Sequence, residues 1–374
     1  MKKIKIAHIL HSVGGVDVSL RLILQNINDE KYDNFVIHAK DDAKVDYVDK
    51  RGFKIRDYKT DIIRNISIFK DLKSIYFTYN IIKKEKPQVI HCHSAKGGFI
   101  GKIIGMALNI RVYHTPQAFS YLSTQNKFKR LIFLWIEKSL KGKNIFLLAS
   151  SHSEYIRAIK EVGFKKEQTK IFNNCINPIK FVKPLSIQKT WPKNYICTVG
   201  RPSYQKNIDL MIRVIAEIKK ETDIHLVLMG VGHHADELDN IKKLILNLDL
   251  SNNVTLLNWT SREDVFNIIK NSKIYISTAR YEGLPYSIIE SMSLSKPCIV
   301  SDCDGNRDLI EDCVNGFIIK DNDINLFKER ILELFGDNSL LEKYSKSAYL
   351  SFCKNYNIKN NIRDLELIYS KNSL

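Results

Sequence analysis

The stretch that decides the fold reads Arg280-Tyr281-Glu282-Gly283-Leu284-Pro285-Tyr286-Ser287-Ile288-Ile289-Glu290. It follows the apolar run 274–277, which predicts a short buried strand. Pro285 suits the first turn of a helix, because the N–H that proline lacks has no partner there. We therefore expect Glu282 on the loop that leaves the strand and Glu290 inside the next helix. In open α/β sheets, ligands bind at such loops.

The two glutamates of this stretch have side chains suited to hydroxyl groups. Glu282 and Glu290 each carry a carboxylate, which accepts hydrogen bonds. Backbone amides at the start of the helix between them favour an anionic ligand. A ligand with both phosphate and several hydroxyl groups is a sugar nucleotide, and this is the ligand class that the stretch predicts.

A second informative stretch is Val199-Gly200-Arg201-Pro202-Ser203-Tyr204-Gln205-Lys206-Asn207. Gly200 permits a tight turn, and Arg201 and Lys206 place two cations before an expected helix start. Such cations neutralise a diphosphate as its charge grows during leaving-group departure. Two surface cations on a loop are the plain alternative. The glutamate stretch in the same half of the chain favours a binding site.

Apolar strand-like runs alternate with amphipathic segments of helix length, which predicts an α/β fold with parallel sheets and crossover helices. In the first half we expect strands at 4–10, 35–39, 89–92, 111–114 and 145–149. In the second half we expect them at 195–199, 225–229, 254–257, 274–277, 298–301 and 316–319. An irregular, proline-containing linker over 177–192 separates the two series. The chain is thus expected to form two Rossmann-like domains that face each other across a cleft.

Size and composition are those of a globular protein. The 374 residues suffice for two domains, and 44% hydrophobic with 26% charged residues excludes disordered and fibrous classes. No apolar run is long enough to span a bilayer, and the amino terminus predicts a strand and turn, not a signal peptide. The seven cysteines contain no C-x-x-C pair, so we expect reduced thiols and a cytoplasmic location.

The net charge of +17 indicates an acidic partner without naming it. Basic and aromatic residues are mixed over 66–86 and again over 127–143. Basic amphipathic helices with aromatics suit an anionic lipid surface, and core helices with solvated lysine faces are the alternative. The first interpretation predicts a peripheral enzyme at the inner face of the cytoplasmic membrane.

Three smaller motifs complete the pattern. Gly14 and Gly15 lack the full G-x-G-x-x-G spacing, so a dinucleotide site is not expected, but phosphate or acceptor contact is. His91 and His93 alternate onto one face of a strand end, where His93 could line the cleft; further ligands at zinc-like spacing are missing. The D-x-D string at 302–304 is expected to form a turn and not a metal site.

These motifs together resemble one family. Glu282 and Glu290 with Gly283 and Pro285 resemble the E-x7-E signature of retaining glycosyltransferases of family 4, glycosyl transferases group 1, which have the GT-B fold. The other matching segments, in the family's order along the chain, are 13–15, 200–206, 304–310 and 315–318. The resemblance implies an acceptor-binding domain over 1–178, a nucleotide-sugar domain over 179–350 and a helix over 351–374 that packs back on the first domain.

The resemblance also implies residue roles. Arg201 and Lys206 would bind the donor diphosphate, Glu290 the ribose hydroxyls and Glu282 the donor sugar. The full donor-binding set is Gly15, Arg201, Lys206, Trp259, Glu282, Gly283, Leu284, Pro285 and Glu290. On the acceptor side of the cleft we expect Gly14 and His93, from their places at a helix start and a strand end, and Glu282, His114 and Gln117 are the candidates for catalysis. It implies no bound metal and no cofactor beyond the nucleotide sugar.

The chain departs from the family after Thr115-Pro116, where a histidine is common and Gln117 stands here. His114 precedes it, but strand alternation turns that side chain to a different face. The expected function is transfer of a hexose or N-acetylhexosamine from a nucleotide sugar, with UDP-sugar favoured. The expected acceptor is lipid-linked or a growing surface polysaccharide, as in lipopolysaccharide or capsule assembly in bacteria.

Three other functions remain open at this point. A UDP-N-acetylglucosamine 2-epimerase would convert donor without an acceptor, and a sugar-nucleotide sensor would bind donor without turnover. A nucleic-acid-binding protein is motivated only by the charge, so no nucleic acid is expected as a partner.

Overall fold

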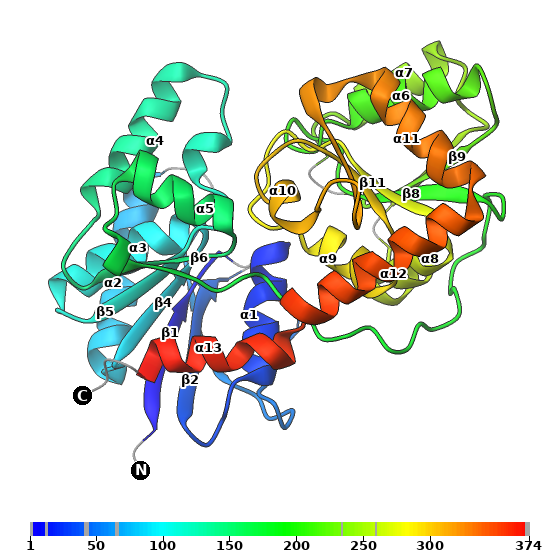
Figure 1. The fold of residues 1–374 in the computed structure, drawn as a ribbon. Helices are drawn as coiled ribbons and strands as arrows, with labels where there is room; N and C mark the ends of the chain where they lie inside the picture. Colours follow the sequence, from blue (N-terminus) through cyan, green and yellow to red (C-terminus); the bar gives the residue numbers. More distant parts are fainter. Residues whose placement is uncertain are drawn as a thin grey trace. The chain divides into compact units, whose positions relative to one another are not determined.

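The computed structural model describes residues 3–11, 14–40, 45–63, 67–232, 235–258 and 260–370 (Figure 1). The chain divides into two compact units. The first contains Met1–Asn177 together with Ile358–Leu374, and the second contains Pro178–Asn357. Trp259, a member of the expected donor-binding set, lies outside the described residues.

The first unit is built on a 7-stranded parallel sheet with the order β3-β2-β1-β4-β5-β6-β7. Its strands are β1 (Ile4–Ile9), β2 (Tyr32–Ala39), β3 (Arg56–Thr60), β4 (Val89–His93), β5 (Arg111–Thr115), β6 (Ile145–Ala149) and β7 (Thr169–Ile171). The five expected strands are confirmed within a few residues. The edge strands β3 and β7 were not predicted, because each has exposed positions and lacks a continuous apolar run.

Helices cover both faces of this sheet, as parallel sheets require. The helical segments are α1 (Gly15–Asn26), α2 (Ile68–Glu85), α3 (Ser94–Ala107), η1 (Ser120–Leu122), α4 (Lys127–Ser139), α5 (His152–Arg157), η2 (Ala158–Val162), η3 (Lys166–Gln168) and α13 (Ile358–Ser370). Residues of α2, α3 and α4 share one apolar cluster with the sheet. Residues of α1 and α13 pack on the other face. The core of the unit therefore lies in two layers, one on each side of the strands.

The second unit repeats the plan with a 6-stranded parallel sheet in the order β10-β9-β8-β11-β12-β13. Its strands are β8 (Tyr195–Val199), β9 (His225–Met229), β10 (Val254–Leu257), β11 (Ile274–Ser277), β12 (Cys298–Ser301) and β13 (Gly316–Ile319). Its helical segments are α6 (Ile208–Lys219), α7 (Leu238–Asn247), α8 (Arg262–Asn271), α9 (Tyr286–Ser293), α10 (Asn306–Leu309), η4 (Lys320–Asn322), α11 (Ile324–Gly336) and α12 (Asn338–Asn355). The strand bounds equal the predicted ones, because each strand here is a short apolar run. Helices α6, α7 and α11 share the main apolar cluster of this unit.

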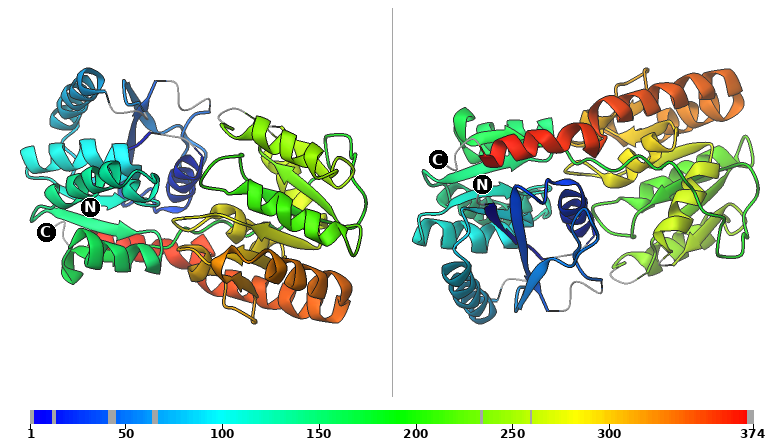
Figure 2. Two further views of the ribbon diagram at one scale, coloured as in Figure 1. Left: turned by 90° about the horizontal axis from the view of Figure 1, so that it is seen from above. Right: turned by 90° about the horizontal axis from the view of Figure 1, so that it is seen from below.

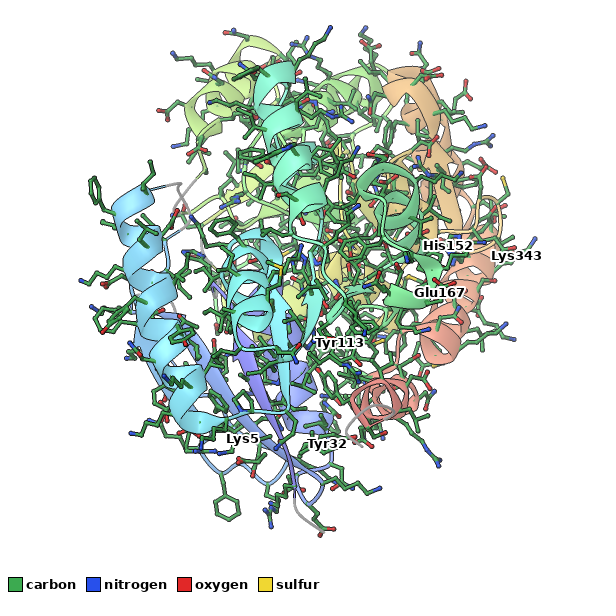
Figure 3. The ribbon with its side chains drawn as sticks, turned by 90° about the vertical axis from the view of Figure 1, so that its left-hand side faces the viewer. Lys5, Tyr32, Tyr113, His152, Glu167 and Lys343 are labelled. Carbon is green, nitrogen blue, oxygen red and sulfur yellow. The ribbon has the colours of Figure 1, made fainter. Side chains whose placement is uncertain are left out.

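The carboxyl-terminal helix α13 belongs to the first unit, and both views of Figure 2 show it, in red, against the strands of that unit. Tyr32 and Tyr113, labelled in Figure 3, donate from their hydroxyls to the backbone oxygens of Glu366 at 2.7 Å and Ile368 at 2.9 Å. The returning segment begins at residue 358 and not at 351. Residues 351–355 continue α12, which packs on α9 in the second unit.

The helices of the described ranges include none that combines the length and the apolar character needed to cross a membrane.

Candidate functional site

The centre of the site in the second unit is an ion pair between two residues that the sequence predicted to bind the same ligand. Lys206 Nζ donates to Glu282 Oε1 at 2.7 Å. The other carboxylate oxygen, Oε2, accepts from Gln205 Nε2 at 3.3 Å. Only 8% of Glu282 is exposed, and these donors satisfy its two buried carboxylate oxygens. Sequence reasoning missed Gln205, although it lies next to Lys206.

Two loops meet around this pair, one after β8 and one after β11. Arg280 N donates to Gln205 O at 2.8 Å, and Arg280 Nη1 donates to Tyr204 O at 2.6 Å. Thr278 Oγ1 donates to Asn207 O at 2.9 Å. Because β8 and β11 are neighbours in the sheet, the two loops form one wall at the carboxyl ends of the strands. This is the edge at which open α/β sheets bind ligands.

Glu290 lies inside α9, as predicted, and Pro285 directly precedes the helix. The Glu290 carboxylate is 5% exposed, and Arg262 Nη2 of α8 donates to its Oε1. Burial raises the pKa of Glu290, and the opposing charge of Arg262 lowers it less than burial raises it. Arg262 was not predicted, because only the folded chain brings the start of α8 to α9.

Close contacts and ion pairs fix the other residues of the loops around the Lys206–Glu282 pair. A Cβ on Gly305, whose φ is +71°, would lie 2.5 Å from Gly283 O, so only glycine fits there. Leu284 is buried, and the Gly200 Cα faces the aliphatic stem of Lys206. Arg201 lies half-buried in the loop after β8. Both carboxylates of the D-x-D string, Asp302 and Asp304, are ion-paired with Arg307 at 2.6 Å.

In the first unit, Gly14 and Gly15 lie exposed at the start of α1, with φ of +60° at Gly14. The strand ends beside them carry three buried histidines. His91 and His93 point to the same face of β4, as alternation predicts, and His8 of β1 joins them. The potential ligand nitrogens of the three rings lie within 4.8 Å of one another. Sequence reasoning missed His8, which is 85 positions from His93.

Hydrogen bonds account for most nitrogens of this cluster. His8 Nδ1 lies 3.1 Å from His93 Nε2, and His8 Nε2 lies 3.1 Å from Asn34 Oδ1. His91 bonds the Tyr369 hydroxyl at 2.6 Å and Thr115 Oγ1 at 2.9 Å. Burial lowers the pKa of His8 to about 4 and the pKa of His91 and His93 well below their ordinary value. The rings are therefore neutral near pH 7.

Neutral rings fix the direction of the chain of hydrogen bonds. With the Asn34 amide oriented so that Oδ1 accepts from His8 Nε2–H, His8 Nδ1 must accept from His93 Nε2–H. His93 Nδ1 then carries a lone pair. This atom is buried, and no described residue bonds to it. His93 thus presents a hydrogen-bond acceptor at the carboxyl end of β4.

His114 and Gln117, the two candidates at the end of β5 and just after it, have different surroundings. His114 pairs in register with Cys92, so it lies on the opposite face of the sheet from His91 and His93. Its Nε2 bonds Ser94 O at 3.0 Å, and its ring packs so closely on Gly98 of α3 that a Cβ there would lie 2.1 Å from Nε2. Gln117 has a φ of +54°, and its Nε2 is buried with no partner in the described part of the chain.

Known proteins resemble this chain in sequence and in fold. Residues 184–351 match the family described as "Glycosyl transferases group 1". The chain is 28% identical to the UDP-Gal:alpha-D-GlcNAc-diphosphoundecaprenol alpha-1,3-galactosyltransferase of Escherichia coli, over 98% of this chain and 97% of that protein.

Two solved structures share the fold over nearly the whole chain. One is the sucrose-phosphate synthase of Thermosynechococcus elongatus, with a TM-score of 0.84 at 16% identity and 99% coverage of both chains. The other is the Anabaena protein HepE in complex with UDP-glucose, with a TM-score of 0.79 at 16% identity, covering 98% of this chain and 99% of that one. Residues 184–351 therefore match glycosyl transferases group 1, and the chain as a whole has the GT-B fold that these structures share.

Proposed function

We propose that the enzyme transfers a hexose or N-acetylhexosamine from a UDP-sugar to a lipid-linked or growing surface-polysaccharide acceptor, with retention of configuration. The observation that carries the proposal is the Lys206–Glu282 pair on the wall formed by the loops after β8 and β11. In this proposal Lys206 is the cation that binds the diphosphate, and Glu282 is the carboxylate that binds a sugar hydroxyl. The names of the Escherichia coli relative and of the HepE complex support the choice of uridine and of a diphosphate-linked acceptor.

On the donor side, Arg201 and Lys206 hold the diphosphate. Glu290, oriented by Arg262, accepts from ribose hydroxyls, and Glu282 accepts from a hydroxyl of the sugar. The backbone of Gly283 to Pro285 borders the sugar. Trp259 and Gly15 complete the proposed donor set.

On the acceptor side, His93 and Gln117 offer complementary groups. The lone pair of His93 Nδ1 accepts from a hydroxyl, and Gln117 Nε2 donates to an oxygen. Gly14 lets the backbone approach the acceptor closely, since a Cβ there would meet nothing within 4 Å. His114, which packs under α3, has no part in this proposal.

The chemistry needs no side-chain nucleophile. The acceptor oxygen forms its bond to the anomeric carbon on the side from which the diphosphate leaves. As the bond to the diphosphate breaks, a diphosphate oxygen takes the acceptor proton. Arg201 and Lys206 neutralise the charge that grows on the leaving group, which is the part a metal plays in other transferases. We therefore propose a metal-independent reaction without a cofactor.

We also propose that the enzyme works at an anionic membrane surface in the cytoplasm. Helix α4 exposes Phe128 at 71%, Leu131 at 63% and Trp135 at 68%. Its one acidic residue, Glu137, is buried against Lys102 at 2.7 Å. The outward surface of α4 is therefore apolar and cationic only, which is the pattern that anionic lipid attracts. A lipid-linked acceptor would be met at that surface.

Donor-induced thermal shifts with UDP-, GDP- and ADP-sugars test the donor, because a ligand stabilises the folded state by mass action. UDP-sugars should raise the melting temperature of the wild type and not that of Lys206→Ala. Transfer to a diphosphate-linked lipid is then followed by mass spectrometry, and the anomeric configuration of the product by NMR. Conversion of the donor without an acceptor would identify an epimerase, and binding without turnover a sensor. An inverted product or dependence on a divalent metal would contradict the mechanism.

A further inference from the structure

The segment that follows β5 has an unusual backbone. Gln117 and Ala118 are consecutive residues with φ of +54° and +79°, and neither is glycine. Side chains with a Cβ adopt this left-handed region at a cost in energy, and they remain in it only where the surroundings hold them. The segment lies at the carboxyl end of a central strand, beside His93 of β4. Something must therefore fix the conformation of these two residues.

A buried carboxylate holds the segment. Glu154 Oε1 accepts from Ala118 N at 2.8 Å. Glu154 Oε2 accepts from Ser150 N at 2.6 Å and from Ser150 Oγ at 2.9 Å. Only 4% of Glu154 is exposed. Three hydrogen bonds to this buried carboxylate tie the loop after β5 to the loop after β6.

The sequence around Glu154 explains how it reaches that position. Ser151 is the N-cap of α5, and its Oγ accepts from Glu154 N at 3.1 Å. Ser-x-x-Glu is a capping box, in which the glutamate ordinarily turns back to the N–H of its own cap. Here the carboxylate passes the cap and bonds Ser150 and Ala118. A capping box, which ordinarily satisfies the first N–H groups of one helix, thus connects the loops that follow β5 and β6.

The group that this arrangement presents is the Gln117 amide. Its Nε2 is buried and bonds to no described residue. A buried N–H without an acceptor is unfavourable, and an oxygen of a ligand at this edge would satisfy it.

We propose that Glu154 is a positioning residue, which holds Gln117 and Ala118 in left-handed conformations so that the Gln117 amide donates to a hydroxyl or phosphate oxygen of the acceptor substrate. This inference rests on the proposed transferase function and assigns a further residue to it. Because a glutamine amide does not ionise near pH 7, Gln117 orients the acceptor and does not act as a base.

A double-mutant cycle separates this role from a purely structural one. Gln117→Met keeps the side-chain length and removes the donor, and Glu154→Ala removes the carboxylate. Each should lower kcat/KM by about tenfold, the size expected for one hydrogen bond to substrate. If Glu154 acts through Gln117, the double variant should also lose about tenfold, and not the roughly hundredfold loss of independent effects.

Two further variants control for folding. Glu154→Gln retains an oxygen that accepts from Ala118 N, so it should keep kcat/KM within about threefold of the wild type. Ser151→Ala removes the cap of the same helix but leaves the Glu154 carboxylate in place, so it should lower the melting temperature without a comparable loss of kcat/KM. If Glu154→Ala does not fold, the cycle is measured with Glu154→Asp, whose shorter side chain withdraws the carboxylate from Ala118 N.

The outcomes are distinguishable. Transfer by the wild type together with additive losses in the cycle would overturn the role of Glu154 and leave the proposed function intact. An unchanged kcat/KM in Gln117→Met would overturn the role of Gln117. Absence of donor binding and of transfer in the wild type would instead refute the proposed function. UDP-sugar thermal shifts should be the same in all these variants, because none of the substituted residues belongs to the proposed donor set.

Discussion

Lys206 Nζ lies 2.7 Å from Glu282 Oε1, so the cation expected to hold the donor diphosphate is ion-paired with the carboxylate expected to hold the donor sugar. The two residues are 76 positions apart and come from the loops after β8 and β11. In the absence of donor, each neutralises the other in a largely buried place. We propose that an arriving diphosphate gives Lys206 a new anion, so that the Glu282 oxygens can turn to a sugar hydroxyl. In this proposal, donor binding exchanges the partners of both residues and leaves no charge unpaired.

Breaking this pair should harm stability as well as binding. Lys206→Ala leaves a buried carboxylate without its cation, and we expect a loss of about 1–3 kcal/mol in unfolding free energy, since Lys206 is partly exposed. Adding Glu282→Gln should restore much of that stability but not transfer. Urea unfolding and UDP-sugar calorimetry measure the two effects. The exposed pair Lys219–Asp249 is the control, and Lys219→Ala should change stability by less than about 1 kcal/mol. Equal losses at both pairs would contradict the coupling.

Glu290→Gln should stabilise the protein at neutral pH while it weakens donor binding. Burial raises the pKa of Glu290 in the folded state, so the folded protein binds this proton more tightly than the unfolded chain. Stability contributed by the group is then highest at acidic pH and is lost as pH rises through the folded-state pKa. The variant should have the higher melting temperature at pH 7.5, with the difference shrinking toward pH 4. Glu333→Gln at a surface pair is the control. A lower melting temperature for Glu290→Gln at pH 7.5 would refute this prediction.

Gly305→Ala should displace the loop after β11, which carries Glu282, although Gly305 itself is not part of that loop. The added Cβ would meet Gly283 O at 2.5 Å, in a residue whose φ is +71°. We expect a loss of about 2–4 kcal/mol in unfolding free energy from strain and overpacking, and weaker UDP-sugar binding, because Gly283 adjoins Glu282. Gly336→Ala is matched to it, since its Cβ would meet nothing within 4 Å and its φ is not positive. Similar melting temperatures for the two variants would contradict the steric argument.

The buried histidines should make the first unit sensitive to acid. Burial lowers the folded-state pKa of His8 to about 4, below its ordinary 6.5. The unfolded chain therefore takes up a proton between these values and the folded chain does not, so stability falls as pH falls from 6.5 to 4. His91 and His93 act in the same direction. Urea unfolding at pH 4.5, 5.5 and 6.5 should show this slope. His8→Asn should flatten it, and the same change at exposed His152 should not.

The outward side chains of α4 should decide binding to lipid. The double substitution Phe128→Ala with Trp135→Ala should weaken binding to anionic vesicles by about tenfold or more. Each aromatic side chain is expected to bury a large apolar surface at the membrane–water interface. High salt should weaken binding of the wild type, since Lys127, Lys129 and Arg130 attract the anionic headgroups. Vesicle flotation measures both. Phe181, which is 93% exposed outside α4, provides the control Phe181→Ala. Equal binding by all three proteins would exclude α4 as the contact.

All strands of the two sheets except β3 and β7 could be predicted from the sequence. Each of them is a short apolar run, because helices bury both faces of a parallel sheet. The stretch 280–290 alone placed Glu282 on a loop and Glu290 in a helix, since proline and strand signals are local. The edge strands β3 and β7 lack such a run. They are set by pairing with β2 and β6, which a local pattern does not show.

The amino-acid sequence by itself determined two α/β units, the helix start at Pro285 and the candidate donor residues. Only the tertiary structure decided the partners of those residues. It paired Lys206 with Glu282 and Arg262 with Glu290. It also brought His8 to His93, and it bonded the Glu154 carboxylate to the backbone of the strained Gln117–Ala118 segment. The physical reason is that periodicity and turn chemistry act over a few residues. Hydrogen bonds and ion pairs between residues 28 to 85 positions apart depend on which strand ends the sheet order brings together.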